Sequence, residues 1–196
     1  ANLSQQEARK TLGWPSDRFI LFTPRRLVHR MGLDKLLTAI SRLGAQKQDV
    51  WLAIAGKGPL RGALEAQVEA LDLHQQVRFL GYLPDDDLPT AYQAADLTVM
   101  PSQALEGFGL VILESLACGT PALCTPVGGM PEIISGFSPE LITSSADADA
   151  IGTTLKAALN GSITLPANAA CRDYATTHFN WPTIADRVEQ VLLETV

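Results

Sequence analysis

Short apolar runs alternate with amphipathic segments along most of the chain. The runs are continuously apolar, which is typical of strands that are covered on both faces of a parallel sheet. We predict strands at residues 18–24, 50–56, 77–82, 96–102, 121–126 and 140–145. In the segments between them apolar residues recur with helical spacing, which predicts helices at residues 33–43, 60–73, 87–95, 109–118 and 147–160.

Repeated strand–helix–strand units with short connections predict right-handed crossovers. The expected fold class is therefore α/β, with a doubly wound, mostly parallel, six-stranded Rossmann-like sheet and helices on both faces. Residues 167–179 and 182–196 are predicted to form two consecutive C-terminal helices. No inner linker or repeat interrupts the chain, so residues 1–196 are interpreted as a single domain. In such sheets ligands bind beyond the carboxyl ends of the strands, so the loops that follow strands are where a site is expected.

Composition and charge exclude several function classes. A net charge of -6, from 15 basic and 21 acidic residues, argues against a nucleic-acid surface. The three cysteines have no metal-ligand spacing, so we expect reduced, buried thiols in a cytoplasmic protein. No apolar run reaches the roughly 18 residues that span a bilayer, and the first ten residues lack the pattern of a signal peptide. Because the chain begins without Met, we interpret it as a domain excised from a longer protein.

The loop after the first predicted strand is basic. Its sequence, TPRRLVHRMG at residues 23–32, contains Arg25, Arg26, His29 and Arg30. Arginine at the carboxyl end of a strand suits phosphate oxygens, because its guanidinium donates two parallel charge-assisted hydrogen bonds. A solvated basic loop with no ligand explains the same residues equally well.

The loop after the second predicted strand is rich in glycine. In IAGKGPLRG, Gly56, Gly58 and Gly62 approach a dinucleotide fingerprint. A site for NAD also needs an acidic residue at the end of the next strand, and none stands there. Pro59 is expected at the first position of the following helix. This leaves either a tight turn that starts a helix or a backbone approach to some other nucleotide.

Two glutamates flank the glycine turn in LEGFGLVILESLACG, residues 105–119. Gly107 and Gly109 expose backbone N–H groups at the start of a helix, where the helix dipole favours anions. A carboxylate such as Glu106 or Glu114 accepts two hydrogen bonds at once and so suits a vicinal diol such as ribose. Capping by Glu106 and simple solvation of Glu114 are the alternative. The apolar neighbours of Glu114 disfavour an unpaired charge and favour a ligand site.

Taken together, these motifs resemble the C-terminal domain of retaining GT-B glycosyltransferases of the glycosyl transferases group 1 family. The resemblance is dense over residues 18–135, and FNWPTIADRV near the end resembles the closing helix of the family. Its hallmark is the pair Glu106-x7-Glu114 within E-G-F-G-L…E-x-x-A-x-G-x-P. A second glycine pair follows in GGMPEII, where Gly128 and Gly129 either line the same crevice or only form a turn.

The resemblance implies transfer of a sugar from a nucleotide-sugar donor with retention of anomeric configuration, without a cofactor and without an obligatory metal. It also implies that residues 167–196 pack toward an N-terminal domain of the same protein, which holds most of the acceptor site. The acceptor would be a saccharide, a lipid or a small molecule. A lipid acceptor would place the cytoplasmic protein at the inner face of the membrane. We expect the isolated chain to bind donor weakly and to be inactive.

Individual residues acquire roles through the same resemblance. Arg26 matches the arginine on the donor diphosphate. Met31 stands where the family usually has a lysine. The second cation on the diphosphate must therefore come from Arg30 or from another residue, and Arg25 is also counted among the donor-binding residues. Glu106 matches the carboxylate near the transferred sugar, where we expect it to orient the sugar for front-face attack; with Arg26 it forms the catalytic set. The resemblance implies that further residues bind the nucleotide-sugar donor, namely Gly56, Gly58, Pro59, Gly81, Tyr82, Leu83, Gly107, Phe108, Gly109, Leu110 and Glu114.

Two further interpretations stay open. One is a catalytically inert nucleotide-sugar-binding module, and the other is a GT-B-like sugar-nucleotide epimerase or a phosphorylase. The intact glutamate signature counts against both. In addition, no lysine stands in a setting suited to pyridoxal phosphate.

Overall fold

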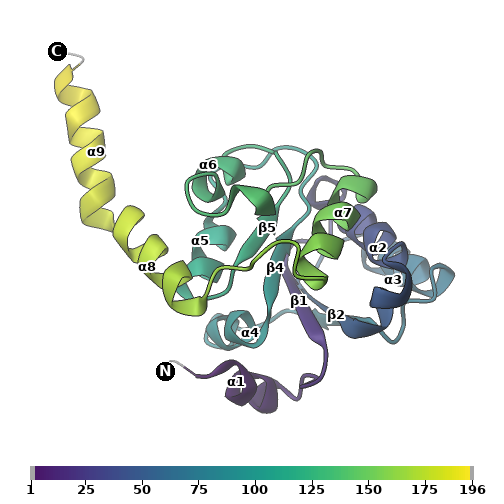
Figure 1. The fold of residues 1–196 in the computed structure, drawn as a ribbon. Coiled ribbons are helices and arrows are strands. Elements are labelled where there is room, and N and C mark those ends of the chain that lie inside the picture. Colours follow the sequence, from purple (N-terminus) through teal and green to yellow (C-terminus); the bar gives the residue numbers. More distant parts are fainter. Residues whose placement is uncertain (1–2, 195–196) are drawn as a thin grey trace.

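The computed structural model describes residues 3–194. At its centre is a parallel sheet with the strand order β3-β2-β1-β4-β5 (Figure 1). The five strands are β1 (Phe19–Pro24), β2 (Val50–Ala55), β3 (Val77–Gly81), β4 (Leu97–Met100) and β5 (Ala122–Cys124). All four neighbouring pairs run parallel. The predicted α/β class is confirmed, with one strand fewer than expected.

The predicted strand at residues 140–145 is wrong. Its only pairing among the described residues is an isolated parallel bridge between Cys124 and Ile142. Pro139–Leu141 instead form a 3-10 turn, η3, and β5 ends at Cys124, so the ladder has no length over which to continue. Pro139 favours the start of this turn because its φ is fixed near the helical value, and the turn includes the first two residues of the predicted strand.

The helices connect the strands as the spacing predicts. Those expected between strands are α2 (Leu33–Ser41), α3 (Arg61–Ala70), α4 (Leu88–Ala94), α5 (Leu110–Ala117) and α7 (Ala148–Leu159). The short α6 (Met130–Ile134) follows β5, and α8 (Asn168–His178) and α9 (Trp181–Glu194) follow α7. Residues 195–196 of the last predicted helix lie outside the described residues.

The first helix, α1 (Gln5–Leu12), was not predicted. A capping box starts it, with Ser4 and Glu7 exchanging hydrogen bonds. Arg9 ties it to the end of α4 through an ion pair of 2.6 Å with Asp96 and a hydrogen bond to the Ala94 carbonyl. The sequence signal S-x-x-E was present, but the helix is too polar to show a clear apolar period.

Both faces of the sheet are buried, and alternate residues of β1 separate the two cores. Ile20 and Phe22 point into a small cluster that includes Tyr92 of α4, and Leu21 points into the larger cluster on the other face. This two-sided burial is the physical reason for the continuously apolar strands.

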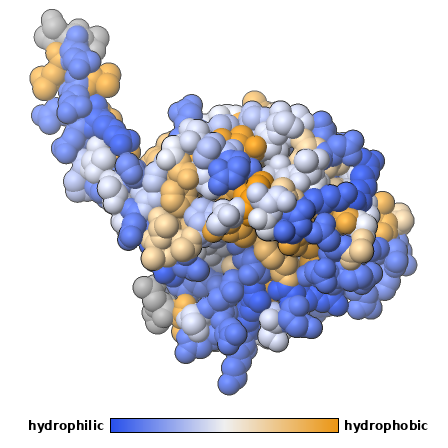
Figure 2. All heavy atoms as spheres, in the orientation of Figure 1, coloured by the Kyte–Doolittle hydropathy of each residue, from blue (hydrophilic) through white to orange (hydrophobic). Residues whose placement is uncertain are grey.

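The C-terminal helix α9 projects away from the domain (Figure 1). None of its described residues is buried, and Trp181 is 85% exposed. Hydrophobic side chains stand among hydrophilic ones along it (Figure 2). By contrast, α8 packs on α5 through the buried residues Cys171 and Ala175. That residues 167–196 pack toward a further domain stays a prediction.

Candidate functional site

The site lies where the strand order reverses. From β1 the chain continues through α2 to β2 on one side of the sheet, and from β4 it continues through α5 to β5 on the other. Because β1 and β4 are neighbours and the chain leaves them toward opposite sides, this is the switch point of the sheet, near which ligands bind in open α/β folds. The arginine loop, residues 25–32, and the glutamate loop, residues 101–109, meet there.

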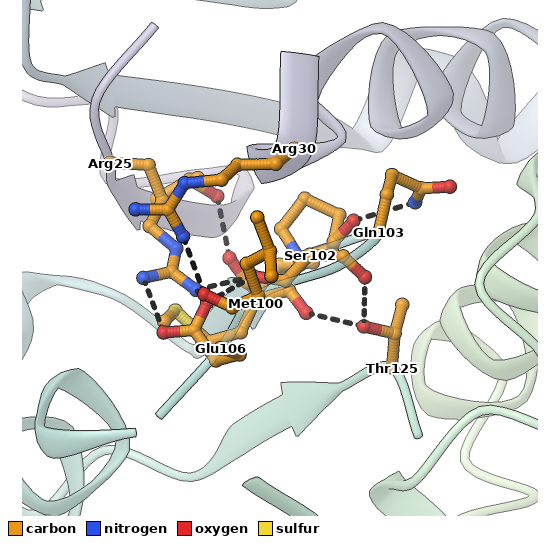
Figure 3. A network of polar contacts seen from close by, with 11 residues as sticks. Arg25, Arg30, Met100, Ser102, Gln103, Glu106 and Thr125 are labelled. Carbon is orange, nitrogen blue, oxygen red and sulfur yellow. Dashed lines mark hydrogen bonds and ion pairs between the residues drawn. The ribbon is translucent and has the colours of Figure 1, made fainter. Parts of the chain in front are cut away.

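Arg25 and Glu106 form an ion pair between these two loops. The Nη2 atom of Arg25 lies 2.6 Å from Oε2 of Glu106, and its Nη1 atom lies 3.3 Å from Oε1 (Figure 3). Ser102 donates its hydroxyl to the same Oε2 at 2.7 Å and also accepts from Arg25. The two charged side chains are only 6% and 11% exposed. A buried carboxylate is tolerated here because a cation and a hydroxyl both satisfy it.

The glutamate loop is held by further polar contacts. Thr125 donates its hydroxyl to the Ser102 carbonyl at 2.6 Å, and Arg30 donates to the Leu105 carbonyl at 2.7 Å (Figure 3). Leu105 has a left-handed backbone with φ of 54°. The contact from Arg30 therefore supports a strained turn that aims Glu106 inward. Ser102 and Thr125 were missed by sequence reasoning, because single hydroxyls after strands carry little signal.

The glycine turn continues into α5. No side chain caps this helix among the described residues, and Gly109 at its start has φ of 92°. The first N–H groups of α5 therefore have no side-chain partner among the described residues. Gly128, with φ of 61°, packs directly behind, since a Cβ there would lie 2.0 Å from the Glu106 carbonyl oxygen. Gly129 donates its N–H to the Gly107 carbonyl at 2.8 Å. The second glycine pair thus supports the turn.

The glycines after β2 serve close contact between two loops. A Cβ on Gly56, which has φ of 142°, would lie 1.9 Å from the Arg25 carbonyl oxygen, and one on Gly58 would lie 2.3 Å from that of Leu27. The fingerprint-like spacing is therefore explained by backbone packing against the arginine loop. The expectation for Pro59 is wrong in detail, because this residue stands in the turn before α3, which begins at Arg61.

A first depression, which we call the arginine hollow, opens at the ends of β1, β2 and β3. It has a volume of about 230 Å³. Its lining residues are Pro24, Arg25, Arg26, Ala55, Gly56, Tyr82, Leu83, Asp85 and Leu88. Lys57 lies over the exposed Tyr82 ring, with Nζ 5.3 Å from its centroid. Predicted residues from three separate loops thus meet around one opening.

A second depression, the glutamate hollow, adjoins the first through Asp85 and Leu88. Its volume is about 480 Å³, and its lining residues are Asp85, Leu88, Pro89, Tyr92, Glu114, Ala117 and Cys118. The Tyr92 hydroxyl donates to Oε2 of Glu114 at 2.8 Å. Burial, followed by the negative charge of Glu114, raises the pKa of Tyr92 far above its usual value, so the hydroxyl keeps its proton. Asp85 and Tyr92 were not singled out by the sequence.

Several predicted residues lie outside both hollows. Gly58 and Pro59 stand behind the arginine loop, and Gly81 accepts a hydrogen bond of 2.6 Å from Gly56 through its carbonyl. Phe108 and Leu110 line a separate apolar depression of about 290 Å³ at the junction of α8 and α9. There the Phe108 ring lies 6.1 Å from that of Phe179.

Among the described residues, no group of three or more His, Cys, Asp or Glu side chains could hold a metal ion. The three cysteines are free, and burial raises the pKa of Cys124 to about 12 and that of Cys171 to about 11. Burial also raises the pKa of Cys118, with the Arg172 cation acting in the opposite direction. In residues 3–194 no helix is long and apolar enough to cross a membrane.

Similar proteins agree with this architecture. A protein of Corynebacterium glutamicum described as a GDP-mannose-dependent monoacylated alpha-(1-6)-phosphatidylinositol monomannoside mannosyltransferase is 31% identical over 191 residues, which cover 94% of this chain and 49% of that protein. A D-inositol 3-phosphate glycosyltransferase of Corynebacterium jeikeium is 32% identical over 203 residues, which cover 96% of this chain and 46% of that protein. The chain thus spans about half the length of these relatives.

Solved structures share the fold. Anabaena Alr3699/HepE, crystallised with UDP and glucose, superposes with a TM-score of 0.81 at 23% identity, over 97% of this chain and 52% of that one. The C-terminal domain of the group 1 glycosyl transferase LpcC from Francisella tularensis superposes with a TM-score of 0.78 at 23% identity, over 92% and 95%. The sequence profile of the glycosyl transferases group 1 family matches residues 4–178. The chain therefore belongs to this family and corresponds to the C-terminal domain of a GT-B glycosyltransferase.

Proposed function

We propose that this chain is the donor-binding half of an enzyme that moves a sugar from a nucleoside diphosphate sugar to an acceptor hydroxyl with retention of anomeric configuration. The observation that carries the proposal is that Arg26 lines a hollow at the carboxyl ends of the strands together with Arg25, which is the ion-pair partner of Glu106. The adjoining glutamate hollow adds Glu114 within one continuous surface.

The diphosphate would lie between Arg26 and the first turn of α5. Arg26 is exposed at the rim of the arginine hollow, and the uncapped N–H groups after Gly109 carry the positive end of the helix dipole. Negative charge grows on the diphosphate as it leaves the sugar, so these groups stabilise the transition state more than the bound donor. They do so without a metal ion.

The nucleoside would occupy the two hollows. Glu114 keeps acceptor sites beyond the one that Tyr92 fills, and these suit the two hydroxyls of ribose. The base would lie near Tyr82 and Leu83, with the Asp85 carboxylate at its edge. A carboxylate can accept from both the ring N–H and the amino group of guanine, and the corynebacterial mannosyltransferase is described as GDP-mannose-dependent. GDP-mannose is therefore the first donor to test.

The acceptor would bind mainly to an N-terminal domain of the same protein. Relatives named for phosphatidylinositol substrates support a lipid acceptor and peripheral association with the inner face of the membrane. The isolated chain is then expected to bind donor weakly without turnover.

Isothermal titration of the 196-residue chain with GDP, UDP and ADP, and with GDP-mannose and UDP-glucose, tests the proposal. We expect at least one nucleotide to bind with a Kd at or below about 1 mM, and Glu114→Ala to weaken it about tenfold by removing the ribose contact. Glu140→Ala, which removes a carboxylate of η3 outside both hollows, is the matched control and should change nothing. A failure of every compound to bind would refute the donor-site assignment. Sugar transfer by the isolated chain would refute its expected inactivity.

A further inference from the structure

The two arginines that follow β1 have different surroundings. The Arg25 side chain is almost fully buried, and both of its terminal nitrogens contact Glu106 (Figure 3). Arg26, in contrast, is exposed at the arginine hollow. A guanidinium recognises a phosphate best through a two-pronged edge, and in Arg25 the Glu106 carboxylate already occupies the edge formed by Nη1 and Nη2, while the buried Nε has no hydrogen-bond partner among the described residues. Adjacent residues of one motif are therefore suited to different tasks.

The contacts around Glu106 leave it one direction in which to bind a ligand. Its Oε2 atom accepts from both Arg25 and Ser102, whereas Oε1 accepts only the longer bond of 3.3 Å from Arg25. A carboxylate offers about four lone-pair positions, so Oε1 retains capacity for a hydroxyl donor. The capacity that remains suits a sugar hydroxyl and is electrostatically unsuited to a phosphate.

The backbone around this ion pair is also fixed. Thr125 anchors the Ser102 carbonyl, and Gly128 packs against the Glu106 carbonyl oxygen. Arg25 itself is held by a hydrogen bond of 2.8 Å from its N–H to the Ala55 carbonyl. With both ends anchored, the ion pair sets where the carboxylate lies, so that a ligand meets a preorganised group.

We propose that Arg25 is a positioning residue, which holds Glu106 ready for a hydroxyl of the transferred sugar and does not itself bind the diphosphate. This inference rests on the proposed donor site. It assigns the diphosphate to Arg26 and gives Arg25 an indirect role in selecting the sugar. Loss of Arg25 should then weaken binding of the nucleotide sugar and leave the affinity for the nucleoside diphosphate unchanged.

Paired titrations with a nucleoside diphosphate and its sugar test this division. GDP and GDP-mannose form one pair and UDP and UDP-glucose the other, used with wild type, Arg25→Met, Glu106→Gln and Arg26→Met. We expect Arg26→Met to weaken both members of the pair about tenfold. Arg25→Met and Glu106→Gln should weaken the nucleotide sugar about tenfold and change the affinity for the diphosphate less than about twofold. Arg42→Met, which breaks an exposed ion pair with Asp149, is the matched control and should leave both affinities unchanged.

Arg25→Met leaves Glu106 buried without a cation, which can prevent folding. A double substitution keeps the test valid in that case. Arg25→Met/Glu106→Leu removes both charges, a change that buried ion pairs commonly tolerate. It should bind the diphosphate like wild type and show the same loss for the nucleotide sugar as Glu106→Gln alone, because the two residues act as one unit.

Two results would count against these ideas, and they differ. If removal of Arg25 weakens binding of the diphosphate as much as removal of Arg26 does, the positioning role is wrong. The donor site would still be supported. If wild type binds none of the four compounds, the proposed function itself fails.

Discussion

The two glutamates of the site differ in the partner that each has. Glu106 is neutralised by the Arg25 cation, whereas Glu114 receives a hydrogen bond from the neutral Tyr92 hydroxyl. An ion pair fixes a carboxylate and cancels its charge, whereas a hydroxyl orients it and leaves the charge in place. Glu114 is thus the more strongly negative of the two toward a ligand, which makes it a strong acceptor for the ribose hydroxyls of the proposed donor.

Replacement of Tyr92 by phenylalanine isolates this contact. Tyr92→Phe keeps the ring that packs against Phe22 but removes the hydroxyl, so the free energy of unfolding should fall by about 1 kcal/mol. Nucleotide affinity should fall several-fold, because Glu114 loses its orienting donor. Urea unfolding and titration measure the two effects.

The control is Tyr174→Phe, which removes a hydroxyl that donates to the Ile133 carbonyl at 2.9 Å, away from both hollows. It should lower stability by a similar amount and leave nucleotide binding unchanged. Equal binding by wild type and Tyr92→Phe would show that the orientation of Glu114 does not matter.

At the scale of elements, glycine positions hold the loops of the site together. Because Gly56 and Gly58 lack side chains, the arginine loop packs closely against them. The glutamate turn packs against Gly128 in the same way. In each contact a backbone atom of one loop would meet a side chain placed on the other, so the loop after β1 interlocks with that after β2, and the loop after β4 interlocks with that after β5.

Gly128→Ala should therefore destabilise the chain more than an alanine at an equally left-handed but open position. At Gly128 a Cβ adds a clash with the Glu106 carbonyl to the strain of φ at 61°. We expect a loss of about 3 kcal/mol for Gly128→Ala and about 1 kcal/mol for Gly161→Ala, whose φ is 75° with no atom within 4 Å. Urea unfolding of both variants decides this, and equal losses would mean that the turn moves freely away from Gly128.

Sequence patterns predicted the elements better than the contacts between them. The apolar runs gave five of the strands, because burial on both faces leaves a plain signal in each run. They failed at 140–145, where Pro139 and the short β5 prevent pairing, and at α1, which is held largely by polar contacts. Glu114 was expected to need a partner, but nothing local identifies Tyr92. Arg25 and Glu106 lie 81 residues apart, so their pairing depends on the neighbouring positions of β1 and β4.

At the scale of the whole molecule, α9 differs from every other α-helix in its lack of buried residues among those described. A chain that ends at Asn180 should therefore keep its free energy of unfolding within about 1 kcal/mol of the full chain, because exposed residues contribute little. It should also associate less at high concentration, since exposed apolar residues such as Trp181 and Leu192 are removed. Urea unfolding and light scattering measure these effects, and a stability loss well above 2 kcal/mol would show that α9 supports the domain.

The interlock of the loops has a consequence for how such a domain diversifies. Because it consists of backbone carbonyls and glycines, it does not depend on the side chains at Tyr82, Leu83 or Asp85 that line the hollows. In the proposed donor site, substitutions at those positions should change which base is recognised while the backbone of the loops keeps its place. Selectivity for the donor and stability of the loops would then be determined by different residues, so that point mutations alone could change the donor.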